Sequence, residues 1–143
     1  MYIQVNNPAT EQLITELKTD TTKVIKEKYA KCRNAQPAWA ALPLQERLAC
    51  ITRFHALLET NKDMLADALT SEVGKPVQQS YNELNGARAR IQYFLDKAEK
   101  YLADEWVTDD GLTKERISYE PLGVIANISA WNYPYLVGVN VFI

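Results

Sequence analysis

The sequence has few of the residues that bind metals or form disulfides. Its 143 residues include two cysteines, Cys32 and Cys50, and one histidine, His55. The cysteines do not form a C-x-x-C pair, so neither a zinc site nor a disulfide framework is indicated. Neither cysteine stands at an expected helix N-terminus or beside a base that would activate a thiol, so neither is indicated as a nucleophile. We expect both to be small apolar residues within helices.

The chain also lacks a strong excess of charge and any long apolar run. Sixteen Lys and Arg residues against eighteen Asp and Glu residues give a formal net charge of −2, without a block of like charges. Nucleic acid is therefore not expected as a partner. No stretch is long and apolar enough to span a bilayer, and residues 1–6 do not resemble a signal peptide, so we expect a cytoplasmic protein without a membrane partner.

Glycine is scarce, with five residues, and no G-x-G-x-x-G or G-x-x-x-x-G-K-[ST] motif occurs. The one Gly-Lys pair, Gly74-Lys75, is followed by Pro76. Glycine accepts the left-handed conformation that ends a helix and proline cannot continue one. The three residues therefore predict a helix stop and not a phosphate-binding loop.

Between residues 20 and 105 the apolar residues recur at helical spacing, which predicts four helices. The first follows a run of capping residues at 19–22, and Pro37 favours a kink or an early end. The second begins at Pro43, the third covers residues 62–73, and the fourth is a long amphipathic helix from residue 77 to about 102. The first helix carries its larger residues on one stripe: Ile25, Tyr29, Cys32, Gln36 and Trp39.

The two ends of the chain have β-like patterns. Residues 3–5 and 13–17 flank a turn-forming segment and predict an edge hairpin or ribbon. The Asp-Gly pair at Asp110-Gly111 predicts a hairpin turn, followed by an exposed strand over residues 114–120. Residues 124–129 are apolar and β-branched, which predicts a strand covered on both faces as in a parallel sheet. Pro134 is placed to begin a helix, and residues 135–143 are almost wholly apolar, so we expect the burying partner of this helix to lie outside the chain.

Residues 120–134, with the sequence EPLGVIANISAWNYP, resemble the aldehyde dehydrogenase family signature, in which a Pro-x-Gly-Val strand leads into Trp-Asn-aromatic-Pro. The start of the chain, the second helix and the turn at residues 72–76 resemble other family landmarks in the expected order. Two departures are Glu11, where glycine is usual, and Ala130, where proline is common. The resemblance covers essentially the whole chain and about the first third of a full-length member.

The resemblance implies an incomplete α/β fold. Residues 1–106 would form the N-terminal hairpin and the four-helix part of a Rossmann-like NAD(P)-binding domain. Residues 107–121 would be strands of an oligomerisation domain, and residues 122–143 would be the first strand of the Rossmann-like sheet, the Trp-Asn loop and the start of a helix. A full-length member would form a homodimer or homotetramer.

Asn132 matches the family's oxyanion-stabilising asparagine, a neutral and directional donor aimed at charge that develops during the reaction. From spacing alone, an alternative is that Asn132 caps the helix at Pro134, because asparagine is among the best N-cap residues. The resemblance assigns the wall of the cofactor cleft to four residues: Ile128, Ser129, Ala130 and Trp131. Without it, Trp131 would be interpreted as a core or interface aromatic residue.

Tyr133, Val137 and Asn140 follow one another at helical spacing and would share one face. By resemblance they line the aldehyde channel, and simple core packing is an equally good interpretation. No metal ligand is indicated.

The sequence thus supports two hypotheses. In the first, the chain is the N-terminal portion of an NAD(P)-dependent aldehyde dehydrogenase, which oxidises a small aldehyde to a carboxylic acid through a cysteine thiohemiacetal and thioester. The family's cysteine and general-base glutamate lie beyond position 143, so the chain alone should be inactive. In the second, it is a non-catalytic dimerisation or interaction module, against which the apolar final helix argues.

Overall fold

The structure is a computed structural model that describes residues 1–143. Helices and strands alternate in groups along the chain. The elements are β1 (Tyr2–Asn6), β2 (Leu13–Lys18), α1 (Thr22–Ala40), α2 (Leu44–Thr60), α3 (Lys62–Val73), α4 (Val77–Tyr101), β3 (Glu105–Asp109), β4 (Lys114–Ile117) and α5 (Pro134–Phe142). None of these helices has both the length and the apolar character required to cross a membrane.

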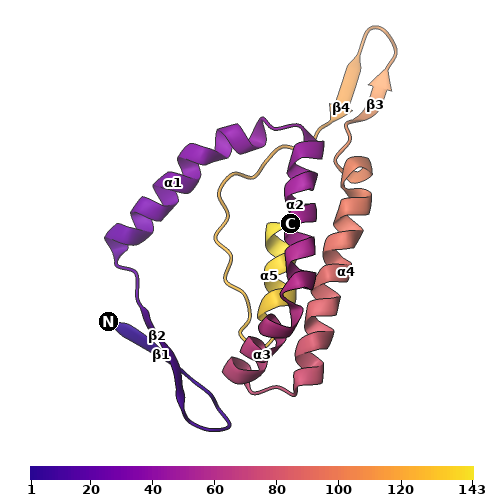
Figure 1. The fold of residues 1–143 in the computed structure, drawn as a ribbon. Helices are drawn as coiled ribbons and strands as arrows, with labels where there is room; N and C mark the ends of the chain where they lie inside the picture. Colours follow the sequence, from indigo (N-terminus) through magenta and orange to yellow (C-terminus); the bar gives the residue numbers. More distant parts are fainter.

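The core is a bundle formed by α2, α3, α4 and α5, which we call the bundle (Figure 1). α4 is its central helix and contacts each of the other three. Leu84, Ala87 and Ile91 of α4 are fully buried and lie three to four residues apart, on one face of the helix. The predicted amphipathic fourth helix therefore packs against the rest of the bundle through this face.

The segment from Gly74 to Pro76 turns the chain from α3 into α4. Gly74 ends α3 in the left-handed conformation, with φ of +79°, and Pro76 is the N-cap of α4. A Cβ atom on Gly74 would lie 2.6 Å from Cγ of Pro8 in the turn between β1 and β2. The predicted helix stop is confirmed. Because Gly74 has no side chain, Pro8 of the N-terminal ribbon can also pack closely against it.

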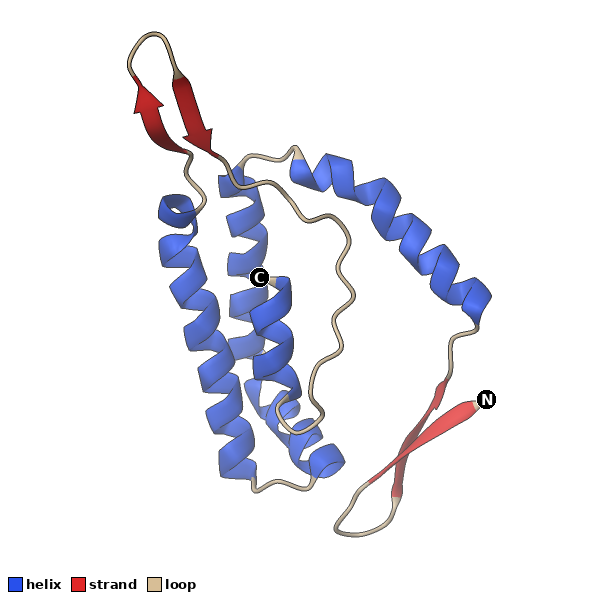
Figure 2. Ribbon diagram, turned by 180° about the vertical axis from the view of Figure 1, so that it is seen from behind, coloured by secondary structure: helices blue, strands red, loops and turns tan.

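The ribbon formed by β1 and β2, together with α1, forms an arm at the side of the bundle, and the turn of the ribbon approaches the bundle at Gly74 (Figures 1 and 2). β1 and β2 pair in antiparallel order, and neither they nor α1 contain a buried residue. α1 continues through Pro37 to Ala40, so this proline does not end the helix early. Ile25 and Tyr29, on the predicted apolar stripe of α1, are more than half exposed.

β3 and β4 form a separate antiparallel hairpin that projects from the end of α4 (Figure 1). Four residues, 110–113, separate the strands, and Gly111 has a φ of +84°. The Asp110 carboxylate accepts the N–H groups of Thr113 and Leu112 at 2.7 and 2.9 Å, which lowers the pKa of this carboxyl group. The predicted turn is confirmed, although β4 ends at Ile117, before residue 120.

The strand predicted over residues 124–129 is not present. These residues belong to an irregular segment, residues 118–133, that passes along the bundle between β4 and α5 (Figure 2). No peptide group from 119 to 129 takes part in a backbone–backbone hydrogen bond. A parallel strand requires a neighbour to complete its ladder, and the strands of this chain are all paired within the two hairpins. The chain is thus mixed helix and strand, without a Rossmann-like sheet of its own.

Candidate functional site

Asn132 lies between the irregular segment and α5. Its side chain is exposed and makes no hydrogen bond within the chain. The N-cap of α5 is Tyr133, and no residue next to it in sequence provides a side-chain cap. The interpretation of Asn132 as a helix cap is therefore wrong, whereas Pro134 does occupy the first turn of α5 as expected.

The N-terminus of α5 is instead capped by Glu83, which comes from α4. Its Oε1 atom accepts the N–H of Tyr135 at 2.8 Å and the N–H of Leu136 at 3.3 Å. Glu83 is only 2% exposed. A carboxylate is favourable at this position because a helix N-terminus has unpaired N–H groups and a partial positive charge.

Lys75 contacts Glu83, Asn132 and Tyr133, and we call these four residues the Asn132 cluster. Its Nζ atom donates to Oε2 of Glu83 at 2.6 Å and to the backbone oxygen of Asn132 at 2.6 Å. The same ammonium group lies 4.0 Å from the ring centroid of Tyr133, at cation–π distance. The Lys75 side chain is 9% exposed. One charged group therefore fixes both Asn132 and the residue after it.

Tyr135 fastens the same end of α5 to α3. Its hydroxyl donates to the backbone oxygen of Leu65 at 3.1 Å. Burial raises the pKa of Tyr135, and the nearby carboxylates of Glu72 and Glu83 raise it further. The phenol consequently stays protonated near neutral pH and remains a donor.

The four residues predicted for the cofactor cleft fall into two groups. The side chains of Ile128, Ala130 and Trp131 are exposed, with Ile128 and Trp131 at 94% and 76%. Ser129 is half-buried, and its hydroxyl donates to Oδ1 of Asn127 at 3.1 Å. The Asn127 amide in turn donates to the backbone oxygen of Gly138 at 3.3 Å, which ties the segment to α5. Core packing of Trp131 is not observed in this chain.

The three residues predicted for the aldehyde channel are only partly brought together. Val137 and Asn140 lie one turn apart in α5, the first half-buried and the second exposed. Tyr133 precedes the helix, and its ring is placed against Lys75. Helical spacing therefore relates Val137 to Asn140 but does not extend to Tyr133.

Lys75 and Glu83 were not recognised from the sequence as parts of this site. The sequence predicts a helix stop at Gly74-Lys75-Pro76 and a long helix that includes position 83, and neither pattern indicates a part in this site. A signal for Glu83 exists, because it precedes Leu84 and lies four residues before Ala87, on the buried face of α4. A carboxylate on such a face requires a partner, since charged residues are seldom buried alone.

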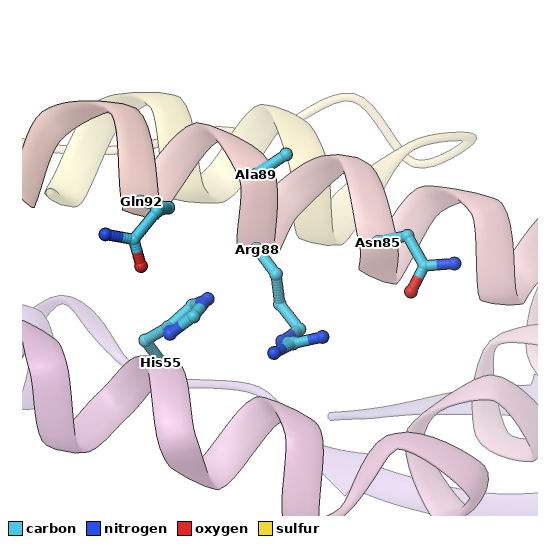
Figure 3. A pocket seen from close by; sticks show the side chains of 5 residues that line it. All are labelled: His55, Asn85, Arg88, Ala89 and Gln92. Carbon is cyan, nitrogen blue, oxygen red and sulfur yellow. The ribbon is translucent and has the colours of Figure 1, made fainter.

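A polar hollow lies between α2 and α4 (Figure 3). Its volume is about 310 Å³, and it is lined by His55, Asn85, Arg88, Ala89 and Gln92. His55 and Arg88 point into it from opposite helices, and the Arg88 guanidinium is paired with Glu59 at 2.5 Å. No residue of α5 or of the irregular segment lines this hollow, so it is separate from the Asn132 cluster.

Comparisons with known proteins agree with the resemblance of the motifs. A sequence profile described as "Aldehyde dehydrogenase family" matches residues 1–142. A probable succinate-semialdehyde dehydrogenase [NADP(+)] from Synechocystis is 33% identical over 94% of this chain and 30% of its own length. A glutarate-semialdehyde dehydrogenase from Pseudomonas putida is 32% identical over 92% of this chain and 28% of its own.

The fold is shared with solved structures. An aldehyde dehydrogenase from Brucella melitensis biovar abortus superposes with a TM-score of 0.91 at 27% identity, over 99% of this chain and 29% of that protein. The chain therefore spans about 30% of the length of the relatives that it matches. Because the profile match extends from the first residue to residue 142, the chain belongs to the aldehyde dehydrogenase family.

Proposed function

We propose that the chain is the N-terminal portion of an NAD(P)-dependent aldehyde dehydrogenase that acts in the cytoplasm and oxidises a small aldehyde to a carboxylic acid. The observation that carries this proposal is the state of Asn132, within a chain whose family is established. Its backbone is fixed by Lys75, and its amide is exposed and without a partner in the chain.

Asn132 would stabilise the oxyanion of a thiohemiacetal. A preorganised donor is most effective when its position is fixed before charge develops, because little reorganisation then accompanies the reaction. Cys32 and Cys50 lie within α1 and α2 and not at a helix N-terminus. The attacking cysteine and the glutamate that activates water for thioester hydrolysis would therefore come from outside residues 1–143.

Bound NAD(P)+ would accept the hydride from the substrate. Residues 119–129 have unpaired peptide groups and the side chains of Ile128, Ala130 and Trp131 are exposed, which fits one wall of a cofactor cleft. Helix N-termini commonly bind the phosphates of such cofactors. The N-terminus of α5 is occupied by Glu83, however, so we expect other parts of the protein to hold the pyrophosphate.

The substrate would be a small aliphatic aldehyde. The relatives named above as succinate-semialdehyde and glutarate-semialdehyde dehydrogenases make short aldehydes with a terminal carboxylate the first compounds to test. Tyr133, Val137 and Asn140 would line the approach to Asn132. The exposed β3–β4 hairpin, which projects beyond the bundle, would contribute to a homodimer or homotetramer.

The test uses the longer protein proposed here, of which residues 1–143 would be the N-terminal portion, and compares it with its Asn132→Ala variant. Formation of NADH or NADPH is followed by absorbance with succinate semialdehyde as substrate. Loss of one oxyanion donor should lower kcat on the order of 10²–10³-fold. The matched control is Asn85→Ala, which removes an exposed amide on α4, away from α5, and should leave kcat unchanged.

Two results would contradict the proposal: a wild-type protein that does not oxidise aldehydes with either cofactor, or an Asn132→Ala variant that keeps the wild-type kcat. The 143-residue chain alone should show no turnover. Dimerisation of an inactive chain through β3 and β4 would support the interaction module instead.

A further inference from the structure

The Lys75–Glu83 pair is the one ion pair of the chain in which both side chains are nearly or fully buried. Their exposed fractions are 9% and 0%. The desolvation of two charges offsets much of their mutual attraction, so a buried pair is weak evidence for a contribution to stability. A buried ion pair can instead fix one local geometry among several. The role of this pair therefore depends on which residues it holds in place.

The pair holds the residues on both sides of the Asn132 amide. Glu83 uses its two oxygens for different purposes: Oε1 accepts two N–H groups at the start of α5, and Oε2 accepts from Lys75. Lys75 then donates to the backbone oxygen of Asn132 and faces the ring of Tyr133. The Glu83 carboxylate and the Lys75 ammonium group thus link α4 to residues 132–136 through an unbroken series of contacts.

The local backbone brings Lys75 to this place. Gly74 is left-handed and Pro76 begins α4, so Lys75 is the single residue between two helix ends. Glu83 lies two turns further along α4, and its side chain meets Lys75 where the two helices join. The arrangement depends on the turn between α3 and α4 and not on residues adjacent to Asn132.

We propose that Lys75 and Glu83 are positioning residues that orient the Asn132 amide for the reaction, a proposal that rests on the proposed function. Neither side chain would touch the substrate. Their role is to hold the backbone of residue 132 while its amide stays free, because catalytic donors act only within a narrow range of positions.

Lys75→Met removes the ammonium and keeps a side chain of similar length. In the longer protein proposed above, kcat and kcat/KM should fall together by about tenfold to a hundredfold, as expected when a donor is misplaced by about 1 Å. Glu83→Gln keeps an oxygen for the cap of α5 but removes the charge that holds Lys75. It should lower kcat in the same way, and it carries the test if Lys75→Met does not fold.

A positioning role requires that the effect pass through Asn132. In an Asn132→Ala background, Lys75→Met should lower kcat by less than about twofold, because groups that act as a unit are not additive. Arg88→Met is the matched control. It breaks another ion pair of α4, Arg88–Glu59, which joins α2 and not α5, and it should leave kcat unchanged. Equal losses of kcat from Lys75→Met with and without Asn132 would overturn the proposal.

A second readout does not depend on activity. Hydrogen exchange of the 143-residue chain should be faster over residues 130–136 in Lys75→Met than in the wild type, and unchanged there in Arg88→Met. Unchanged exchange in Lys75→Met would overturn the positioning role even if the protein is an aldehyde dehydrogenase. If exchange is faster in Lys75→Met but the wild-type protein does not oxidise aldehydes, the proposed function is contradicted while the structural effect of Lys75 on residue 132 is supported.

Discussion

The bundle and the arm have similar amino-acid patterns but different environments. α4 and α1 are both helices with an apolar stripe, yet Leu84, Ala87 and Ile91 of α4 are fully buried and no residue of α1 is. The difference shows what helical periodicity measures. It identifies a face that can be covered, whereas burial depends on whether another element is present to cover it.

The largest expected effect contrasts one isoleucine from each region. Ile91→Ala removes a fully buried side chain from α4 and leaves a cavity, so the free energy of unfolding should fall by about 2–5 kcal/mol. Ile25→Ala is the matched control on α1, where Ile25 is 56% exposed, and its effect should stay within about 0.5 kcal/mol. Urea denaturation of the 143-residue chain measures both. Equal effects would show that the arm is packed as firmly as the bundle.

A smaller effect is expected where the arm meets the bundle. Gly74→Ala places a Cβ in the left-handed conformation, which costs about 1–2 kcal/mol, and directs it against Cγ of Pro8 at 2.6 Å. The free energy of unfolding should therefore fall by more than the conformational cost alone.

The control for this contact is Pro8→Ala, which removes the opposing Cγ atom. In that background Gly74→Ala should be less destabilising, because only the backbone strain remains. The same loss of unfolding free energy in both backgrounds would show that the ribbon does not rest on this turn.

Much of the fold could be predicted because its signals are local. The third helix was predicted over residues 62–73 and its stop at Gly74, since capping and chain-breaking residues act over a few positions. The prediction of a strand over residues 124–129 was wrong. A β-strand needs a neighbouring strand to pair with, and a local sequence pattern does not show whether that neighbour is present in the chain.

The candidate site likewise has a part that the local sequence predicts and a part that it does not. The family motif singled out Asn132, but the cap of α5 comes from Glu83, about fifty residues earlier in the chain. An isolated sequence gives no direct measure of such a distant pairing. The only local indication was a carboxylate on the buried face of a helix.

The helix of the arm offers a local effect of about 1 kcal/mol. Thr21 is the N-cap of α1, and its hydroxyl accepts the N–H of Val24 at 3.3 Å. Thr21→Ala should destabilise the first turn of α1 by about 0.5–2 kcal/mol. Hydrogen exchange at Val24 should become faster, whereas exchange at Ile91 in the bundle should not change. Faster exchange at Ile91 would mean that α1 and the bundle unfold together.

The smallest effect is expected in the β3–β4 hairpin, which is as exposed as the arm. Hydrogen bonds from Thr113 and Leu112 lower the pKa of Asp110 in the folded state. A carboxyl group with a lowered folded pKa stabilises the turn at pH values above its unfolded pKa of about 3.9, and this contribution is lost as the pH falls through the folded value. Below about pH 4 the amide signals of residues 112 and 113 should therefore shift in NMR spectra, before signals of the bundle change.

Asp110→Asn keeps an oxygen acceptor and should abolish this shift, because the group no longer titrates. A shift that persists in Asp110→Asn would have to come from another carboxylate of the hairpin. The pH dependence of the turn would then not arise from the hydrogen bonds of Asp110.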